Sequence, residues 1–149
     1  MTSSAPDPHG SRALVDDMSF LLARASALSN AAGNAALADY GLTVRSYSVL
    51  ELAADGGRTS QREIAEFLRL DPSQVVALVD RLQKAGLVER EPDPRDRRAN
   101  VIVATALGLQ TLDTARRSVR SASQALHGDL TESERTMFTD LLRRTAFPG

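Results

Sequence analysis

The chain has 149 residues, 42% of them hydrophobic, and a formal net charge of −1. This length suits a single domain, and this charge does not by itself favour nucleic acid as a partner. The chain lacks cysteine and has only two histidines, which excludes disulfides, thiol chemistry and cysteine- or multi-histidine-ligated metal, so we expect no metal and no cofactor.

The N-terminal third predicts a tail followed by two helices. Residues 1–10 are polar, without the basic and apolar regions of a signal peptide, and we expect them to be disordered. No apolar run reaches the roughly 18 residues of a membrane span, so we expect a cytoplasmic protein. Apolar residues then recur at helical spacing from residue 11 to residue 39, and Gly41 predicts the end of that helix. Thr43 is placed to cap a second helix, which ends at residues 55–57.

Two short helices joined by a tight turn are predicted next. Ser60 and Glu63 form a capping-box pattern that opens the first, and Asp71 and Gln74 form another around Pro72 that opens the second. The second ends at about residue 86. Such a pair is a helix-turn-helix unit. The apolar face of the first helix is Ile64, Phe67 and Leu68, and that of the second is Val75, Leu78, Val79 and Leu82.

The pattern after Gly86 changes to that of strands. Residues 87–90 and 100–103 predict two short strands, separated by a charged, proline-containing loop over residues 91–98. Such a hairpin beside a helix-turn-helix unit has the form of a wing. Thr105 then caps a helix with apolar residues such as Leu109 and Leu126, and a capping box at residues 131–134 opens a last one. The predicted fold is mainly α, a winged helix with about six helices and a two-stranded hairpin.

The exposed side of the helix after Asp71 has the chemistry of a recognition helix. Its beginning offers short polar side chains for base edges, and its later cations suit the DNA backbone. Gln74 suits an adenine, Ser73 a base or a phosphate, and Val76 a thymine methyl group. The alternative is that Ser73 and Gln74 only cap the helix and that the cations are ordinary surface charges. The candidate contacts here are Ser73, Gln74, Val76, Ala77, Arg81 and Lys84.

The predicted wing carries three arginines, Arg95, Arg97 and Arg98. On a narrow hairpin, one guanidinium can enter a minor groove while others contact phosphates. The alternative is a solvated charge run, but the position directly after a recognition-type helix favours DNA. We expect Asp96, and Asp80 in the preceding helix, to hold arginines in position and to organise the wing.

Several short segments, taken together, are typical of one protein family. They are Leu42-Thr43, Ile64-Ala65, Asp71 with Ser73, and residues 78–82, 86–88, 93–98 and 105–108. From about residue 13 to residue 146 the chain therefore resembles the multiple-antibiotic-resistance regulator (MarR) family of bacteria. Ala77 departs from the many relatives that carry a longer polar side chain there. The absence of cysteine excludes the peroxide-sensing branch of the family.

The resemblance implies a homodimeric transcriptional regulator, usually a repressor, that binds pseudo-palindromic double-stranded DNA with two recognition helices in successive major grooves. Residues 11–149 are then a single domain, with residues 59–104 as the DNA-binding lobe and residues 11–40 and 105–147 as dimerisation helices. Residues 58–98 hold nine Lys or Arg and eight Asp or Glu, so one lobe alone is expected to bind weakly. The candidate DNA contacts are completed by Ser60, Gln61 and Arg62, and by Arg45, which suits a phosphate.

The resemblance also implies release from DNA by a small, often aromatic or anionic, molecule bound between the dimerisation and DNA-binding parts. Arginine and tyrosine beside an apolar cleft can hold a carboxylate or a phenol. The alternative is that the aromatic residues belong to an ordinary core. The candidate pocket residues are Phe20, Arg24, Tyr40, Tyr47 and Arg116.

Two other functions are alternatives to DNA binding. An enzyme is not supported, because the sequence has no glycine-rich phosphate loop, clustered histidine, thiol or apolar pair of carboxylates. A winged helix that binds only proteins is the other alternative, since the fold supports that use. Three arginines in the wing favour DNA.

Overall fold

The computed structural model describes residues 12–149, and the disordered tail predicted for residues 1–10 lies outside this range. The described part is mainly helical with a two-stranded antiparallel sheet, so the predicted fold class is confirmed, although it has seven α-helices where about six were expected. The elements are α1 (Arg12–Val15), α2 (Met18–Leu37), the 3-10 helix η1 (Ala38–Tyr40), α3 (Val44–Ala54), α4 (Gln61–Leu68), α5 (Pro72–Lys84), β1 (Val88–Asp93), β2 (Asp96–Ala104), α6 (Ala106–Leu126) and α7 (Glu132–Ala146).

The expectation of one unbroken helix over residues 11–39 is wrong. The backbone of Asp17 is extended, and its carboxylate accepts a hydrogen bond from the backbone N–H of Phe20 at 2.7 Å, so a new helix begins there. The C-terminal end of α2 continues directly as the 3-10 helix η1, and Gly41 follows in the left-handed region with φ 66°. Apolar periodicity continues across Asp17, which is why the break is invisible in the pattern alone.

The core around the helix-turn-helix unit forms where α3, α4 and α5 meet the hairpin. All four predicted apolar residues of α5 are buried, as is Ile64 of α4. The prediction for Phe67 is wrong, because its side chain is 55% exposed and its ring lies 5.7 Å from that of Phe147 near the C-terminus. The largest fully buried side chains are Leu37, Val49, Leu50, Ile64, Val75, Val79, Val88, Val101, Ile102 and Leu112.

The wing has longer strands and a tighter tip than predicted. β1 and β2 pair from Val88 with Ala104 to Asp93 with Asp96, so the expected loop over residues 91–98 reduces to a turn at residues 94–95. A register shift beside Pro92 accommodates this turn. The backbone N–H of Ile102 in β2 donates to the carbonyl of Thr59 at 2.9 Å. This hydrogen bond joins the segment that precedes α4 to the sheet.

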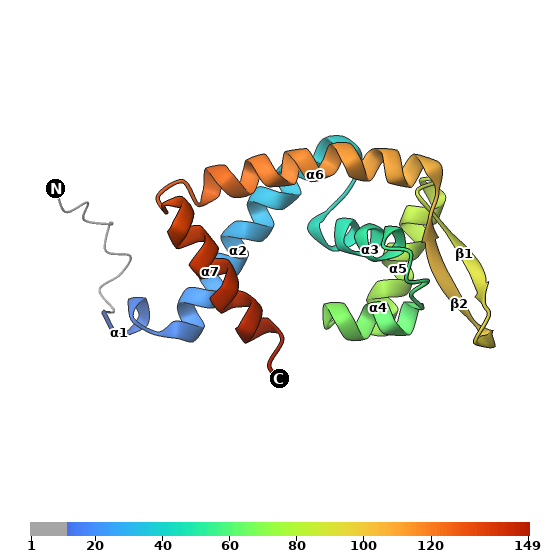
Figure 1. Ribbon diagram of the computed structural model, residues 1–149, viewed down its shortest axis with the longest axis horizontal. Helices are drawn as coiled ribbons and strands as arrows, with labels where there is room; N and C mark the ends of the chain where they lie inside the picture. The colour runs from blue at the N-terminus through green and yellow to red at the C-terminus, as the bar shows by residue number, and fades with distance from the viewer. Residues whose placement is uncertain (1–11) are drawn as a thin grey trace.

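The long helix α6 runs from the wing to the opposite end of the molecule, where it turns into α7 (Figure 1). The first turn of α6 packs very closely on the residue that precedes β1, since a Cβ on Gly108 would stand 2.0 Å from the carbonyl oxygen of Leu87. At the far end α7 contributes no buried residue. The exposed large apolar side chains of this end include Met18, Leu21, Leu22, Leu126, Met137, Phe138, Leu141 and Leu142.

Candidate nucleic-acid interface

The recognition-type helix α5 presents its predicted contact residues to solvent. Its capping box is formed as expected: the carboxylate of Asp71 accepts from the backbone N–H of Ser73 at 3.4 Å, and the side-chain amide oxygen Oε1 of Gln74 accepts from the backbone N–H of Asp71 at 3.1 Å. The Gln74 side-chain NH2 group is not used by this cap and is free to donate to a base. The exposed residues of α5 include Ser73, Gln74, Val76, Ala77, Arg81 and Lys84.

The wing tip is organised by a buried carboxylate that the sequence did not single out. Asp93 is 5% exposed and accepts from the backbone N–H of Arg95 at 2.9 Å and from its Nε at 3.2 Å. The hydrogen bond from the Arg95 backbone, followed by that from its side chain, holds the pKa of Asp93 below its ordinary value. Arg95 also contacts Glu63 of α4 at 3.3 Å. Arg95 therefore braces the wing against α4, as well as standing at its tip.

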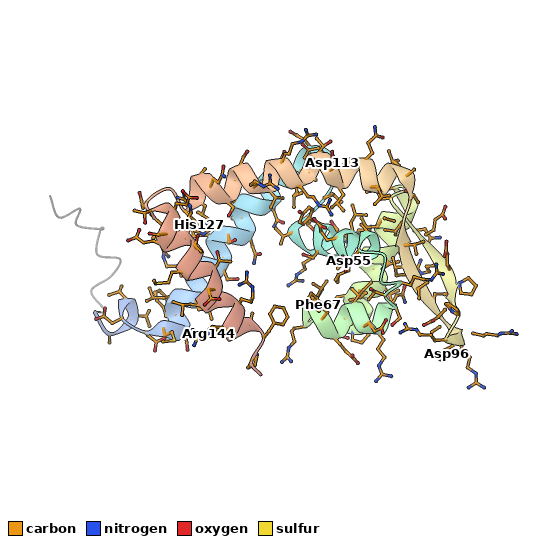
Figure 2. All side chains as sticks on the ribbon, in the orientation of Figure 1. Asp55, Phe67, Asp96, Asp113, His127 and Arg144 are labelled. Carbon is orange, nitrogen blue, oxygen red and sulfur yellow. The ribbon has the colours of Figure 1, made fainter. Side chains whose placement is uncertain are left out.

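The other two wing arginines form no ion pair within the described residues. Among the described residues, neither Arg97 nor Arg98 has an acidic group within ion-pair distance. The carboxylate of Asp96 accepts from the backbone N–H of Arg98 at 3.0 Å, and not from a guanidinium as we expected. Figure 2 places Asp96 at the far tip of the wing, with long side chains pointing away from the protein. Two unpaired guanidinium groups thus project from the tip region.

A fourth wing arginine, which the sequence did not single out, joins the wing to both helices of the helix-turn-helix unit. Arg90 of β1 donates from Nη2 to the Asp80 carboxylate at 2.6 Å, from Nε to the side-chain amide oxygen of Gln61 at 3.0 Å, and from Nη1 to the side-chain amide oxygen of Gln83. Asp80 therefore does hold an arginine, and that arginine belongs to the wing strand. The Arg90 hub, as we call these four residues, makes α4, α5 and β1 a single body. No local pattern identified it, because its partners come from two other elements.

The predicted DNA contacts at the start of α4 already bond to other groups of the protein. The Ser60 hydroxyl accepts from the backbone N–H of Glu63 at 3.2 Å, completing a capping box. Gln61 belongs to the Arg90 hub, and Arg62 pairs with Glu66 one turn later at 3.1 Å. Arg62 remains highly exposed, so this surface pair leaves it accessible to a phosphate.

Arg45 and the recognition helix line one groove, although they are far apart in sequence. This groove, of about 490 Å³, lies between α2, α3 and α5 and includes Arg45, Gln74, Ala77 and Arg81 in its walls. Within the described chain, neither of these two arginines pairs with an acidic side chain. Cations without a partner beside α5 are what a phosphate backbone requires.

The five candidate pocket residues do not come together within one chain. Phe20 and Arg24 lie in the first turns of α2, and at 1.5 Å per residue they are roughly 20–25 Å from its end beside η1. The Tyr40 hydroxyl is hydrogen-bonded to Ser118 of α6 at 2.8 Å. Tyr47 and Arg116 share a third partner, Glu51 of α3, described below.

Glu51 joins α3 to α6. It accepts two hydrogen bonds from Arg116, at 2.8 Å to Nε and 2.7 Å to Nη2, and one from the Tyr47 hydroxyl at 2.7 Å. The hydrogen bond from Arg116 lowers the pKa of Glu51. Burial, followed by the hydrogen bond to Glu51, raises the pKa of Tyr47 to about 12. Tyr47 is therefore a neutral phenol at physiological pH.

A small cavity lies behind Tyr47, between α2, α3 and α6. It has a volume of about 210 Å³, and Gly33, Val44, Tyr47, Val119 and Leu126 are among the residues of its walls. A Cβ on Gly33 would stand 2.6 Å from Val44 Cγ2, so glycine allows α2 and α3 to approach at this point. We call it the α2–α3–α6 cavity.

No helix in the described part of the chain is both long and apolar enough to cross a membrane. Among the same residues, no group of three or more His, Asp or Glu side chains is placed to hold a metal ion.

Comparison with known proteins decides the family. A model of the MarR family matches residues 40–99. The transcriptional repressor NicR of Pseudomonas putida is 30% identical over 142 residues, covering 95% of this chain and 90% of NicR. The chain belongs to the MarR family of transcriptional regulators. Its mainly helical fold with a two-stranded hairpin wing is the winged-helix fold of that family.

Solved structures of the MarR family agree along nearly the whole chain. A MarR-family regulator from Rhodococcus sp. RHA1 is 41% identical, with a TM-score of 0.88 over 93% of this chain and 99% of that one. CouR from Rhodococcus jostii RHA1, solved with p-coumaroyl-CoA, is 42% identical, with a TM-score of 0.82 over 93% of this chain and 98% of CouR. The match to a regulator of the hcr operon from Thauera aromatica, 31% identical over 104 residues, spans 63% of that protein.

Proposed function

We propose that this MarR-family regulator is a homodimeric repressor that binds pseudo-palindromic operator DNA and releases it when a small aromatic molecule binds. In this proposal residues 59–104 are the DNA-binding lobe, and residues 11–40 and 105–147 supply the dimerisation helices. Bacterial operators are reached in the cytoplasm, where we expect the protein to act. The observation that carries the proposal is the set of cations around α5 and on the wing that form no ion pair within the described residues. The Arg90 hub holds the elements that carry them in one body.

The proposed contacts divide by chemistry. The Gln74 amide and Ser73 hydroxyl face bases in the major groove, and Val76 meets a thymine methyl group. Arg97 and Arg98 contact the minor groove and its phosphates. Arg45, Arg62, Arg81 and Lys84 contact the backbone. Because Ala77 offers no polar group, base recognition rests mainly on its neighbours.

A dimer is supported by the exposed apolar side chains at the end of the molecule opposite the wing. Met18, Met137 and Leu141 are 82%, 66% and 49% exposed, and α7 has no buried residue. Monomeric proteins seldom expose so large an apolar face, and a second copy with the same face would cover it. Two lobes would also compensate for the near-neutral charge of one.

Effector release is supported by relatives whose structures were solved in that context. CouR was crystallised with p-coumaroyl-CoA, and BpsR of Bordetella bronchiseptica, 25% identical to this chain, is regulated by 6-hydroxynicotinic acid. Both ligands contain an aromatic ring. The α2–α3–α6 cavity lies between the long helices α2 and α6 and the shorter helix α3, where such a ring would fit.

The DNA-binding test compares wing variants on the protein's own upstream DNA by fluorescence anisotropy. Replacing Arg97 and Arg98 with alanine should weaken binding by at least a hundredfold, because phosphate contacts on both lobes are lost. Arg117→Ala is the matched control, since this exposed arginine lies on α6 and pairs with Asp113. Unchanged affinity in the double variant would refute the wing's role. No retention of the wild type on any duplex DNA at low salt would instead favour a protein-binding winged helix.

The dimer is tested by sedimentation at several concentrations. The wild type should sediment as a dimer, and Leu141→Glu should yield monomers that bind the operator far more weakly. A wild-type monomer that still binds the operator tightly would contradict the two-lobe proposal.

A further inference from the structure

The α2–α3–α6 cavity contains no charged side chain. Its eleven lining residues are apolar or small, apart from Tyr47 and three serines, Ser29, Ser48 and Ser123. The Ser48 hydroxyl donates to the carbonyl of Val44 within its own helix at 2.9 Å, and Tyr47 donates to Glu51 at 2.7 Å. The cavity thus offers apolar walls and neutral hydroxyl groups to whatever enters it.

Two cations, Arg116 and Arg120, act on Tyr47; neither lines the cavity, and the first is already neutralised. Arg116 lies on α6 three residues before the lining residue Val119, which places the two side chains on the same face of the helix. Its guanidinium makes a two-point ion pair with the carboxylate of Glu51, at 2.8 and 2.7 Å. An ion pair with two hydrogen bonds is stronger than one with a single hydrogen bond, and it holds the guanidinium in one orientation. Arg116 is therefore not available as the counter-charge of a ligand carboxylate, which is the role that the sequence suggested for it.

Charge decides which ligand such a site accepts. A carboxylate moved from water into an uncharged cavity loses its hydration without gaining a counter-ion. An uncharged aromatic group gains from burial against the apolar walls, and a phenol or carbonyl on it can pair with the serine hydroxyls. We propose that this cavity binds an uncharged aromatic group, such as a phenol or an aryl ester, and rejects a free aromatic carboxylate. The proposal rests on the effector-responsive function proposed above and names the chemical class of its ligand.

The test compares pairs of probes that differ in little except charge. The full chain is titrated by calorimetry with p-coumarate and methyl p-coumarate, and with salicylate and methyl salicylate. We expect at least one ester to bind, and to bind at least tenfold more tightly than its acid. Equal or tighter binding of the acids would overturn the proposal, and so would the absence of binding by both esters. Ala122→Phe fills the cavity from α6 and should abolish binding of the ester; unchanged ester binding would place the ligand elsewhere and also overturn it.

A second variant tests the role given to Arg116. Glu51→Gln removes the negative charge but keeps the shape of the side chain, which leaves the guanidinium charge uncompensated beside the cavity. The affinity for the acid should then rise at least fivefold, while that for its ester should change less than twofold. Asp140→Asn is the matched control, because Asp140 pairs with Arg143 within α7 at 3.6 Å, and neither affinity should change. An unaltered acid affinity in a folded Glu51→Gln protein would contradict the neutralising role.

Failure of this inference can be told apart from failure of the proposed function. Operator binding without any probe tests the regulator, whereas the acid-to-ester ratio tests the cavity. A chain that binds the operator and prefers the acids refutes only the ligand class. A chain that binds no DNA but prefers the esters refutes the repressor and leaves the ligand class standing.

Discussion

Replacing Arg90 with methionine should separate a positioning role from direct DNA contact. The Arg90 side chain is 24% exposed and makes three hydrogen bonds, to Asp80, Gln61 and Gln83. A hydrogen bond to a charged group contributes about 1.5–3 kcal/mol. The three share one guanidinium, and their partners are reached by water, so the total is nearer to a single such bond. Methionine preserves most of the apolar stem, and we therefore expect about 2 kcal/mol less free energy of unfolding in urea.

The effect on DNA binding follows from loss of alignment. Without the Arg90 hub, α5 and β1 keep their buried apolar contacts but lose the hydrogen bonds that fix their relative orientation. Operator affinity should fall, while the slope of log K against log salt should stay at its wild-type value, because no phosphate contact is lost. Arg98→Ala should reduce the magnitude of that slope by about 2, since each lobe loses one contact worth about 0.9.

The control for Arg90 is another arginine that pairs with β1. Arg58 contacts Glu91 at 2.9 Å, and both side chains are about half exposed, so Arg58→Met should cost at most about 0.5 kcal/mol. A slope that falls in Arg90→Met as much as in Arg98→Ala would show that Arg90 touches DNA. Unchanged stability in Arg90→Met would show that the hub does not hold the elements together.

Three further predictions concern single positions. Gly108→Ala should destabilise the fold by about 2–3 kcal/mol, because the new methyl group would collide with the Leu87 carbonyl at 2.0 Å; denaturant unfolding that matches the wild type would contradict this close packing. Arg69 ends α4 with φ 56°, so Arg69→Gly should be neutral or stabilising and Arg69→Val destabilising by about 1–2 kcal/mol; equal melting temperatures for the two would refute the strain. Because the pKa of Glu51 is lowered in the folded state, its contribution should be complete above about pH 4.5 and lost as the pH falls through the lower folded value. The stability difference between wild type and Glu51→Gln should shrink over that acidic range, and a difference independent of pH would refute the ion pair.

Helix boundaries were accessible from the sequence because their determinants are local. The capping boxes at Thr131, Ser60 and Asp71 each join residues three positions apart, so they form in the same way wherever the helix packs. The four-residue apolar face of α5 likewise follows from helical periodicity alone. The exposed polar residues opposite that face indicate a recognition-type helix without reference to any tertiary contact.

Contacts between elements depended on packing that no local pattern contains. Arg90 finds partners 7, 10 and 29 residues away on two different helices, and Arg116 finds Glu51 at a separation of 65 residues. From the sequence, Arg116 looked like a cation ready for an anionic ligand, since its charge and spacing were visible and its partner was not. The sequence by itself determined which segments are helices, where most of them begin and which face of α5 is polar, because those properties are settled within a few residues. Only the tertiary structure decided which arginines are free to meet DNA and which are held by a carboxylate, because that depends on what another element brings within about 3 Å.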